Sequence, residues 1–231
     1  FITKIETPGV FRDSDDDCFL EVSRWPGVEC TDAGDVRTID FSDYPLKGVY
    51  QWEWLPDTVR VISVGESLII GQVQWHTIPD FVHLFDAGNC GLYGTLDLTV
   101  LPEDLWALNV YMNHLSGSLD FSHLPKDLEA LHLLQNSFSG SIDLSPVRDR
   151  PITDIDFEHI VELVDMDEKP PGPKWLGIDL RLNDFTGDIR IHDIDLIHSV
   201  TPFKGLKCDE IIDGNGESYN RYILQVQLRR K

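Results

Sequence analysis

A segment of this chain occurs twice, with the second copy starting 23 residues after the first. The first copy, LPEDLWALNVYMNHLSGSLDF, begins at Leu101, and the second, LPKDLEALHLLQNSFSGSIDL, begins at Leu124. A fixed period of about 20 to 50 residues is the signature of a solenoid, in which each repeat forms one structural layer. One layer cannot bury its own apolar face, so the layers must stack on one another.

Glycine residues mark the phase of this repeat. They recur at intervals of 23 residues, with a last interval of 47, at Gly48, Gly71, Gly94, Gly117, Gly140 and Gly187. The position nine residues earlier is always apolar: Ile39, Ile62, Phe85, Leu108, Leu131 and Ile178. So is the position seven residues earlier: Phe41, Val64, Ala87, Val110, Leu133 and Leu180. So is the position two residues earlier: Leu46, Ile69, Leu92, Leu115, Phe138 and Phe185. Alternating apolar residues predict a short strand facing a core, and the glycines predict a positive φ or a close backbone approach.

The double interval between Gly140 and Gly187 predicts one further, degenerate repeat over 150–173. The stretch ITDIDFEHI supplies Ile152, Ile155 and Phe157 at the spacing of the apolar columns. The following VDMDEKPPGPK reads as a loop insertion because of its prolines and glycine. Two interpretations of this insertion are open: a binding feature, or sequence drift tolerated in a loop.

An asparagine column follows the expected strands, at Asn113, Asn136 and Asn183. An inward side-chain amide there can satisfy buried backbone groups of the turn and of the neighbouring layer. Ser67 and Cys90 occupy the same column and bond more weakly. Tyr44 and Ile160 do not fit the role.

The whole unit, L-x-x-L-x-L-x-x-N-x-[LF]-x-G-x-[LI], resembles the leucine-rich repeat. The stretch WPGVECTDAGDVRTIDFSDYPLKG resembles the cap that precedes such repeats in plant and protist proteins, and the likeness covers about residues 18 to 191. The resemblance implies an α/β-type repeat solenoid: a horseshoe with a parallel β-sheet on its concave face, a mostly irregular or short-strand convex side, and few helices. It divides the chain into an N-terminal cap (1–35), about seven repeats (36–191) and a C-terminal cap (192–231).

The oxidation state of the cysteines indicates the cellular compartment in which the protein folds. In the resembling caps a pair such as Cys18 and Cys30 forms a disulfide, which implies an oxidising compartment and an extracellular or cell-surface protein. Two reduced structural thiols are the alternative, and they would suit an intracellular or organellar assembly. Cys90 is expected to be a buried thiol, and Cys208 has no evident partner other than Cys90.

The C-terminal stretch CDEIIDGNGESYNRYILQVQL leaves the repeat pattern. Its two apolar segments flank DGNG, a strong turn signal, so we expect a β-hairpin that covers the last repeat.

The net charge and the absence of known catalytic motifs argue against several classes of function. The net charge of −21, from 40 acidic and 19 basic residues, disfavours a nucleic-acid partner. No apolar run reaches the roughly 18 residues of a membrane-spanning helix. No HExxH, CxxC, GxSxG or phosphate-binding glycine motif occurs, and DSDDD at 13–17 lacks the glycine of a calcium loop. We therefore expect no catalytic activity, no metal and no cofactor.

The outward positions of the strands predict the contact surface. An aromatic and apolar middle flanked by charged ends has the composition of a binding patch, and solvated strand positions are the plainer interpretation. The candidate partner-binding residues are Asp86, Asn109, Tyr111, Met112, His132, Leu134, Gln135, Asp156, Glu158, Asp179 and Arg181. The predicted function is a non-catalytic interaction module, or scaffold, that binds a protein or peptide, with a basic partner favoured by the acidic charge. The alternative is a structural or accessory subunit of a larger multiprotein assembly.

Overall fold

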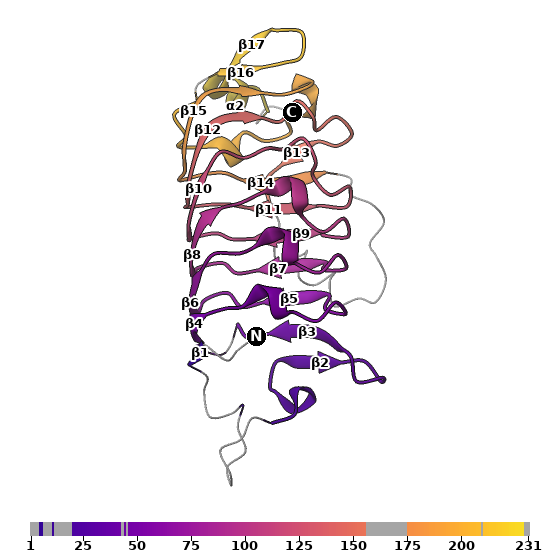
Figure 1. The fold of residues 1–231 in the computed structure, drawn as a ribbon. Coiled ribbons are helices and arrows are strands. Elements are labelled where there is room, and N and C mark those ends of the chain that lie inside the picture. The colour runs from indigo at the N-terminus through magenta and orange to yellow at the C-terminus, as the bar shows by residue number, and fades with distance from the viewer. Residues whose placement is uncertain are drawn as a thin grey trace.

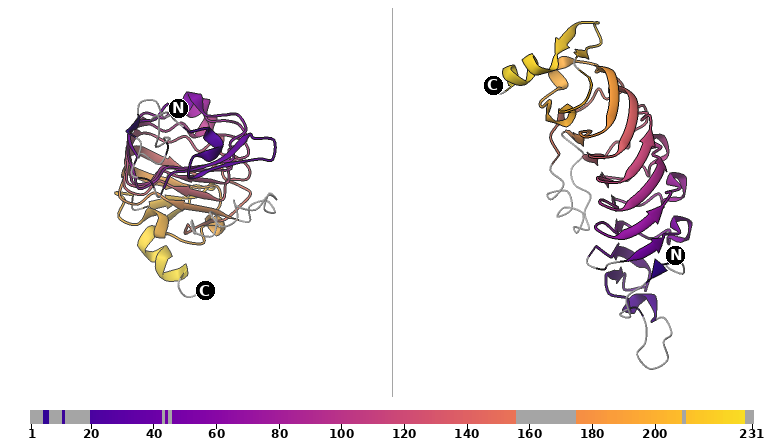
Figure 2. Two further views of the ribbon diagram at one scale, coloured as in Figure 1. Left: turned by 90° about the horizontal axis from the view of Figure 1, so that it is seen from below. Right: turned by 90° about the vertical axis from the view of Figure 1, so that its left-hand side faces the viewer.

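The computed structural model describes residues 5–6, 11, 20–42, 44, 46–155, 175–208 and 210–228. The chain winds into an elongated solenoid whose repeats stack as successive layers (Figure 1). Two sheets run along its length, and the stack curves gently from the N-terminal to the C-terminal end (Figure 2).

The first sheet, which we call the concave sheet, has eight strands in the order β13-β14-β11-β9-β7-β5-β3-β2. Its strands are β2 (Val28–Cys30), β3 (Val36–Asp40), β5 (Val61–Ser63), β7 (Leu84–Asp86), β9 (Ala107–Asn109), β11 (Ala130–His132), β13 (Ile152–Thr153) and β14 (Leu176–Asp179). All neighbours pair in parallel except β2, which runs antiparallel to β3 at the N-terminal edge.

The second sheet carries the glycine column, and its order is β1-β4-β6-β8-β10-β12-β15-β16-β17. Its strands are β1 (Ile5–Glu6), β4 (Lys47–Val49), β6 (Leu68–Gly71), β8 (Gly91–Thr95), β10 (His114–Gly117), β12 (Ser137–Asp143), β15 (Asp184–Arg190), β16 (Glu210–Ile212) and β17 (Ser218–Asn220). The column glycines have φ between 81° and 136°, so the expected positive φ is confirmed.

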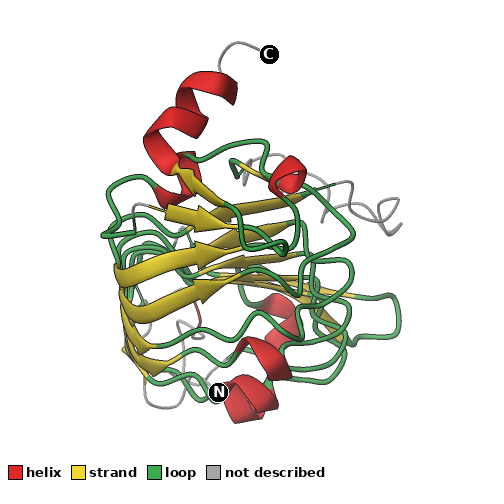
Figure 3. Cartoon of the chain, turned by 90° about the horizontal axis from the view of Figure 1, so that it is seen from above, coloured by secondary structure: helices red, strands yellow, loops and turns green. Residues whose placement is uncertain are grey.

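Helices are few. Short 3-10 helices lie at Val22–Arg24, Trp52–Trp54, Trp75–Thr77, Leu98–Val100, Ile194–Leu196 and Thr201–Phe203. The α-helix of the described residues, α2 (Arg221–Leu228), projects from the C-terminal end of the stack (Figure 3).

The core lies between the two sheets and runs through the layers. Every residue of the three apolar columns is at most 1% exposed, as the repeat pattern predicts. Aromatic rings enlarge the N-terminal layers, where Phe85 packs against both Trp52 and Trp75. The predicted repeat solenoid with a parallel sheet is therefore confirmed.

The place of the degenerate repeat differs from the prediction. Strand β14 pairs directly with β11, through Leu131 and Ile178, so the degenerate repeat predicted over 150–173 does not lie between these two strands. Strand β13 instead lies on the far side of β14, where Ile152 pairs with Leu176. Spacing alone could not reveal the order of these strands. An interval of 47 residues is long enough for an extra layer between β11 and β14, and equally long enough for β13 to lie beyond β14. Residues 156–174 lie outside the described residues.

The C-terminal segment also differs in part. Strands β16 and β17 form an antiparallel pair around the DGNG turn, but the second apolar segment is helix α2 rather than a strand. The side chain of Asn220 accepts bonds from the backbone N–H groups of Tyr222 and Ile223, which is the action of a helix N-cap. Leu224 and Leu228, four residues apart, turn one apolar side of α2 toward the core.

Candidate binding surface on the concave sheet

The register of the concave sheet brings four predicted site residues into one row. Asp86, Asn109, His132 and Asp179 are direct neighbours on β7, β9, β11 and β14. They alternate with the core residues of the same strands, so they point away from the core. Asn109 and Asp179 are buried, with 4% and 2% exposure, so their side chains support their neighbours on this face rather than being open to contact.

A hydrogen-bonded chain organises the N-terminal half of this row. The Oδ1 atom of Asp86 accepts bonds from the Asn109 amide at 2.9 Å and from the backbone N–H of Gly88 at 3.0 Å. Burial raises the pKa of Asp86 to about 6, and the nearby charges of Asp40 and Glu66 act in the same direction. The two donors oppose this shift but do not offset it, because desolvation of the carboxylate is the larger effect.

Tyr111 forms the centre of the surface. Its ring stacks on the His132 imidazole, with centroids 5.2 Å apart and planes at 11°. Its hydroxyl donates to the carboxylate of Glu66, which also accepts from the Asn89 amide at 2.6 Å. These bonds lower the pKa of Glu66, while burial and the bond to Glu66 raise the pKa of Tyr111.

The absence of a side chain at Gly88 allows this position of the tyrosine. A Cβ atom on Gly88 would lie 2.2 Å from the Tyr111 ring, well inside van der Waals contact. The ring therefore crosses the neighbouring layer over Gly88 and reaches Glu66, two layers away.

A salt bridge organises the C-terminal half. The guanidinium of Arg181 donates to both carboxylate oxygens of Asp179, at 2.9 and 2.6 Å. One of these oxygens also lies 3.7 Å from Nε2 of His132. Burial lowers the pKa of His132, and Arg181 adds to this effect while Asp179 opposes it.

Apolar side chains on the turns that follow the strands border the surface. Met112 is 37% exposed, Leu134 is half-buried and Gln135 is exposed. Leu182, which sequence reasoning missed, is 60% exposed. The described turns share a left-handed residue five positions before the glycine, with φ between 50° and 57°: Glu66, Asn89, Met112, Gln135 and Leu182.

The structure thus brings together most of the predicted site residues. Asp156 and Glu158 lie outside the described residues. Sequence reasoning missed Glu66, whose role depends on a contact between layers. It also missed an apolar cluster on the same face of the sheet, whose signal was an apolar column ten residues before the glycine: Val61, Leu84, Ala107 and Ala130, with Trp106 beside them.

The asparagine column forms the predicted ladder. Asn113 accepts from the backbone N–H of Leu92 at 2.9 Å and donates to the carbonyl groups of Ala87 and Val110 at 2.8 and 3.1 Å. Asn136 and Asn183 repeat this arrangement in their own layers. The fold is that of a leucine-rich repeat solenoid.

The chain has low sequence identity to several solved structures. No family model and no curated protein matches the chain. Among solved structures, Pollen Receptor Kinase 3 shares 22% identity over 71% of each chain, with a TM-score of 0.49. The leucine-rich repeat ectodomain of the receptor kinase SOBIR1 from Arabidopsis thaliana shares 20% identity over 53% of this chain and 74% of that one, with a TM-score of 0.45. The BIR3–SERK2 complex from the same plant shares 16% identity over 86% and 81%, with a TM-score of 0.42.

The described residues include no cluster of three or more His, Cys, Asp or Glu side chains that could hold a metal ion. Nor is any helix among them long and apolar enough to cross a bilayer. Cys30 is a half-buried free thiol, and Cys18 lies outside the described residues, so the expected disulfide stays a prediction. Cys208 is fully buried in the core, and burial raises the pKa of Cys90.

Proposed function

We propose that this leucine-rich repeat protein is a non-catalytic interaction module that binds a protein or peptide on its concave sheet. The observation that carries the proposal is the Tyr111 network. Tyr111 is fixed by stacking on His132 and by its bond to Glu66. Exposed Met112 follows it in the chain, and half-buried Leu134 occupies the equivalent position of the next repeat. A pre-oriented aromatic side chain bordered by apolar contacts has the character of a binding hot spot, because little side-chain entropy is lost on binding.

Charge favours a basic partner. Glu66 is exposed at the rim, and the hydrogen bonds that lower its pKa keep it ionised at neutral pH. Among the described candidate residues, Arg181 carries the permanent positive charge, and its salt bridge to Asp179 neutralises that charge. Together with the net charge of −21, the surface attracts cations over distance and speeds their encounter.

Selection of binding peptides from a random displayed library, with the full chain as target, tests the proposal. The selected peptides are expected to bind the Tyr111→Ala variant at least about tenfold more weakly, a loss typical of a hot-spot truncation. Tyr93→Ala is the matched control, because Tyr93 is a half-exposed tyrosine on the second sheet. Equal binding by wild type and Tyr111→Ala contradicts the assignment of the surface.

A structural role in a larger assembly is the second candidate, and one observation favours it. The outer face of the second sheet exposes Val49, Leu68, Ile70 and Tyr93 on strands β4, β6 and β8, with exposures of 42% to 65%. Val49 and Ile70 are direct neighbours in that sheet. If this role holds, a stoichiometric complex isolated with the tagged chain will be lost in Leu68→Asp and retained in Tyr111→Ala.

We further propose that the chain acts at the cell surface or outside the cell. The support is the likeness of the segment around Cys18 and Cys30 to caps that are closed by a disulfide. The test of this location uses protein isolated from its natural source and then denatured. Its cysteines are alkylated before and after reduction, and peptide mapping identifies which of them react. Protection of both cysteines until reduction supports the secretory pathway, and free labelling of both supports an intracellular assembly.

A further inference from the structure

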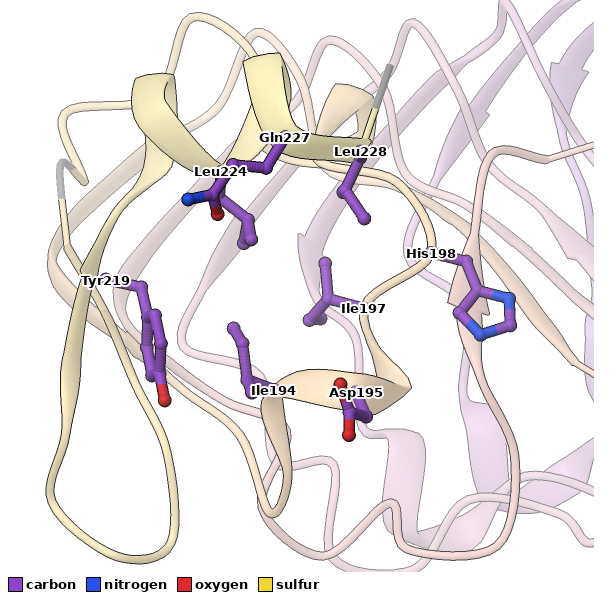
Figure 4. Close-up of a pocket in the computed structure, with 8 residues that line it drawn as sticks. All are labelled: Ile194, Asp195, Ile197, His198, Tyr219, Leu224, Gln227 and Leu228. Carbon is purple, nitrogen blue, oxygen red and sulfur yellow. The ribbon is translucent and has the colours of Figure 1, made fainter. Parts of the chain in front are cut away.

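A cavity separates helix α2 from the last layer of the solenoid. It has a volume of about 470 Å³ and is lined by Ile194, Asp195, Ile197, His198, Tyr219, Leu224, Gln227 and Leu228 (Figure 4). This size falls within the range of pockets that accept small ligands or side chains. We call it the cap pocket.

The walls of the cap pocket are held in place from both sides. Arg221 fixes the start of α2 by donating to the backbone carbonyl groups of Phe203 and Leu206, and Leu224 packs into the core. On the opposite wall, Ile197 is 1% exposed, and the side chain of Asp193 caps the 3-10 helix that carries Ile194. The pocket is therefore a feature of packed elements rather than of a loose end.

The cap pocket continues toward the concave sheet. A second cavity of about 240 Å³ shares His198 and Leu228 with it and extends to Asp154. A third cavity of about 180 Å³ shares Asp154 with the second and reaches Asp179 and Arg181. Because neighbouring cavities share lining residues, we treat the three together as one groove, the cap groove, from α2 to the candidate surface.

The acidic side chains that line the cap groove outnumber its basic ones among the described residues. Asp195 and Asp154 are exposed carboxylates that line it, and Asp154 accepts a bond from Ser199 at 2.7 Å. Arg181 is the lining residue that carries a permanent positive charge among those described, and its charge is neutralised by Asp179. A bound segment thus meets a largely apolar pocket at one end and the carboxylates of Asp195 and Asp154 along its path.

We propose that the cap groove binds an extended basic peptide segment, with one bulky apolar side chain in the cap pocket and a Lys or Arg beside Asp154. The Gln227 amide and the His198 ring lie at the pocket wall, where they can pair with peptide backbone groups. This inference rests on the proposed function, since the cap groove extends the concave surface and adds an anchor site to it.

Two pools of synthetic peptides test the inference on the full chain by fluorescence anisotropy. Each peptide has about a dozen residues, which extend to about 40 Å, and carries one Leu, Phe, Met or Trp. One pool has Lys and Arg at its charged positions and the other has Asp and Glu. We expect binding by the basic pool and at least about tenfold weaker binding when Gln227→Trp fills the pocket or Asp154→Asn removes the charge.

Ile223→Trp is the matched control, because Ile223 lies on the exposed side of α2, with 61% exposure, and does not line the cavity. Binding that persists in Gln227→Trp but is lost in Tyr111→Ala overturns the cap groove and leaves the concave surface intact. Preference for the acidic pool, or no binding by either pool, also overturns it. Self-association of the chain that Gln227→Trp abolishes overturns it in favour of a second copy as occupant.

Discussion

The hydroxyl of Tyr111 donates a hydrogen bond to Glu66, which lies 45 residues earlier in the chain and two layers away in the stack. The bond spans the intervening layer because Gly88 leaves the space that the tyrosine ring occupies. A residue without a side chain thus determines the conformation of the central aromatic residue of the candidate surface.

Gly88→Ala is expected to displace the Tyr111 ring and break its bond to Glu66. The phenol then loses the burial and the bond to Glu66 that raise its pKa, so the Tyr111 pKa, followed by NMR, falls toward the ordinary value near 10. Stability decreases by only about 1 kcal/mol, because the tyrosine can rotate into solvent and the lost bond is near the surface. Gly88→Ala in a Tyr111→Ala background is the control, and a Tyr111 pKa unchanged by the single substitution contradicts the account.

Asp86 makes stability depend on pH. Its pKa of about 6 in the folded state exceeds the unfolded value near 3.9, so the folded protein binds this proton more tightly. This component of stability increases as pH falls from 7 through 6 toward 4. Asp86→Asn keeps an oxygen for Gly88 and Asn109, which both donate to the same carboxylate oxygen, and removes the buried charge.

We therefore expect Asp86→Asn to raise the free energy of unfolding by about 2 kcal/mol at pH 7 and by much less at pH 4. Urea unfolding at a series of pH values measures the difference between variant and wild type. Asp80→Asn is the control, since the Asp80 carboxylate is exposed on the surface. A difference that stays constant from pH 4 to pH 7 would show that Asp86 titrates normally.

Arg181 influences His132 through their shared partner Asp179. The guanidinium lowers the pKa of His132 and the carboxylate raises it. In Arg181→Gln the repulsion disappears and Asp179 interacts with the imidazole alone, so the His132 pKa rises. In Asp179→Asn the carboxylate that raises the His132 pKa is lost, so this pKa falls below its value in the wild type. NMR titration of the His132 ring measures both shifts. Arg190→Gln, on the second sheet, serves as the control. A lower His132 pKa in Arg181→Gln would refute the coupling.

The core could be predicted from the sequence because each apolar column recurs in six layers. Ile39 and Ile178 are 139 positions apart and occupy equivalent places, both fully buried. Periodicity averages over layers, so a single unusual residue does not hide the pattern. The same reasoning located the strand row of Asp86, Asn109, His132 and Asp179.

What periodicity could not supply are relationships that occur once. The bond between Tyr111 and Glu66 depends on one glycine, and the direct pairing of β11 with β14 depends on the path of residues between them. The helix at 221–228 follows from the Asn220 cap and from the packing of Leu224, neither of which the alternation of its apolar residues reveals.

The asparagine ladder accounts for a measurable part of the stability. Asn136 is 8% exposed, accepts from the Leu115 N–H at 3.0 Å and donates to the Val110 carbonyl at 2.9 Å. Asn136→Ala leaves these buried groups without partners, so the free energy of unfolding should fall by about 2–4 kcal/mol. Asn215→Ala, at an exposed position in the DGNG turn, is the control in the same urea assay. Equal loss in both variants contradicts a special role for the ladder.

Cys90 is the weak member of the ladder, and its replacement gives the converse test. Its sulfur lies 3.4 Å from the Val64 carbonyl and 3.5 Å from that of Gly88, but a thiol is only a weak donor. An asparagine there can donate to the Val64 carbonyl and accept from the Ile69 N–H, as Asn113 does one layer further on with Ala87 and Leu92. Cys90→Asn is expected to stabilise the protein by about 1 kcal/mol in urea unfolding, and Cys90→Ala to destabilise it. If Cys90→Asn is the less stable of the two, the space beside Ser67 is too small for an amide, and the ladder is limited by packing rather than by hydrogen bonding.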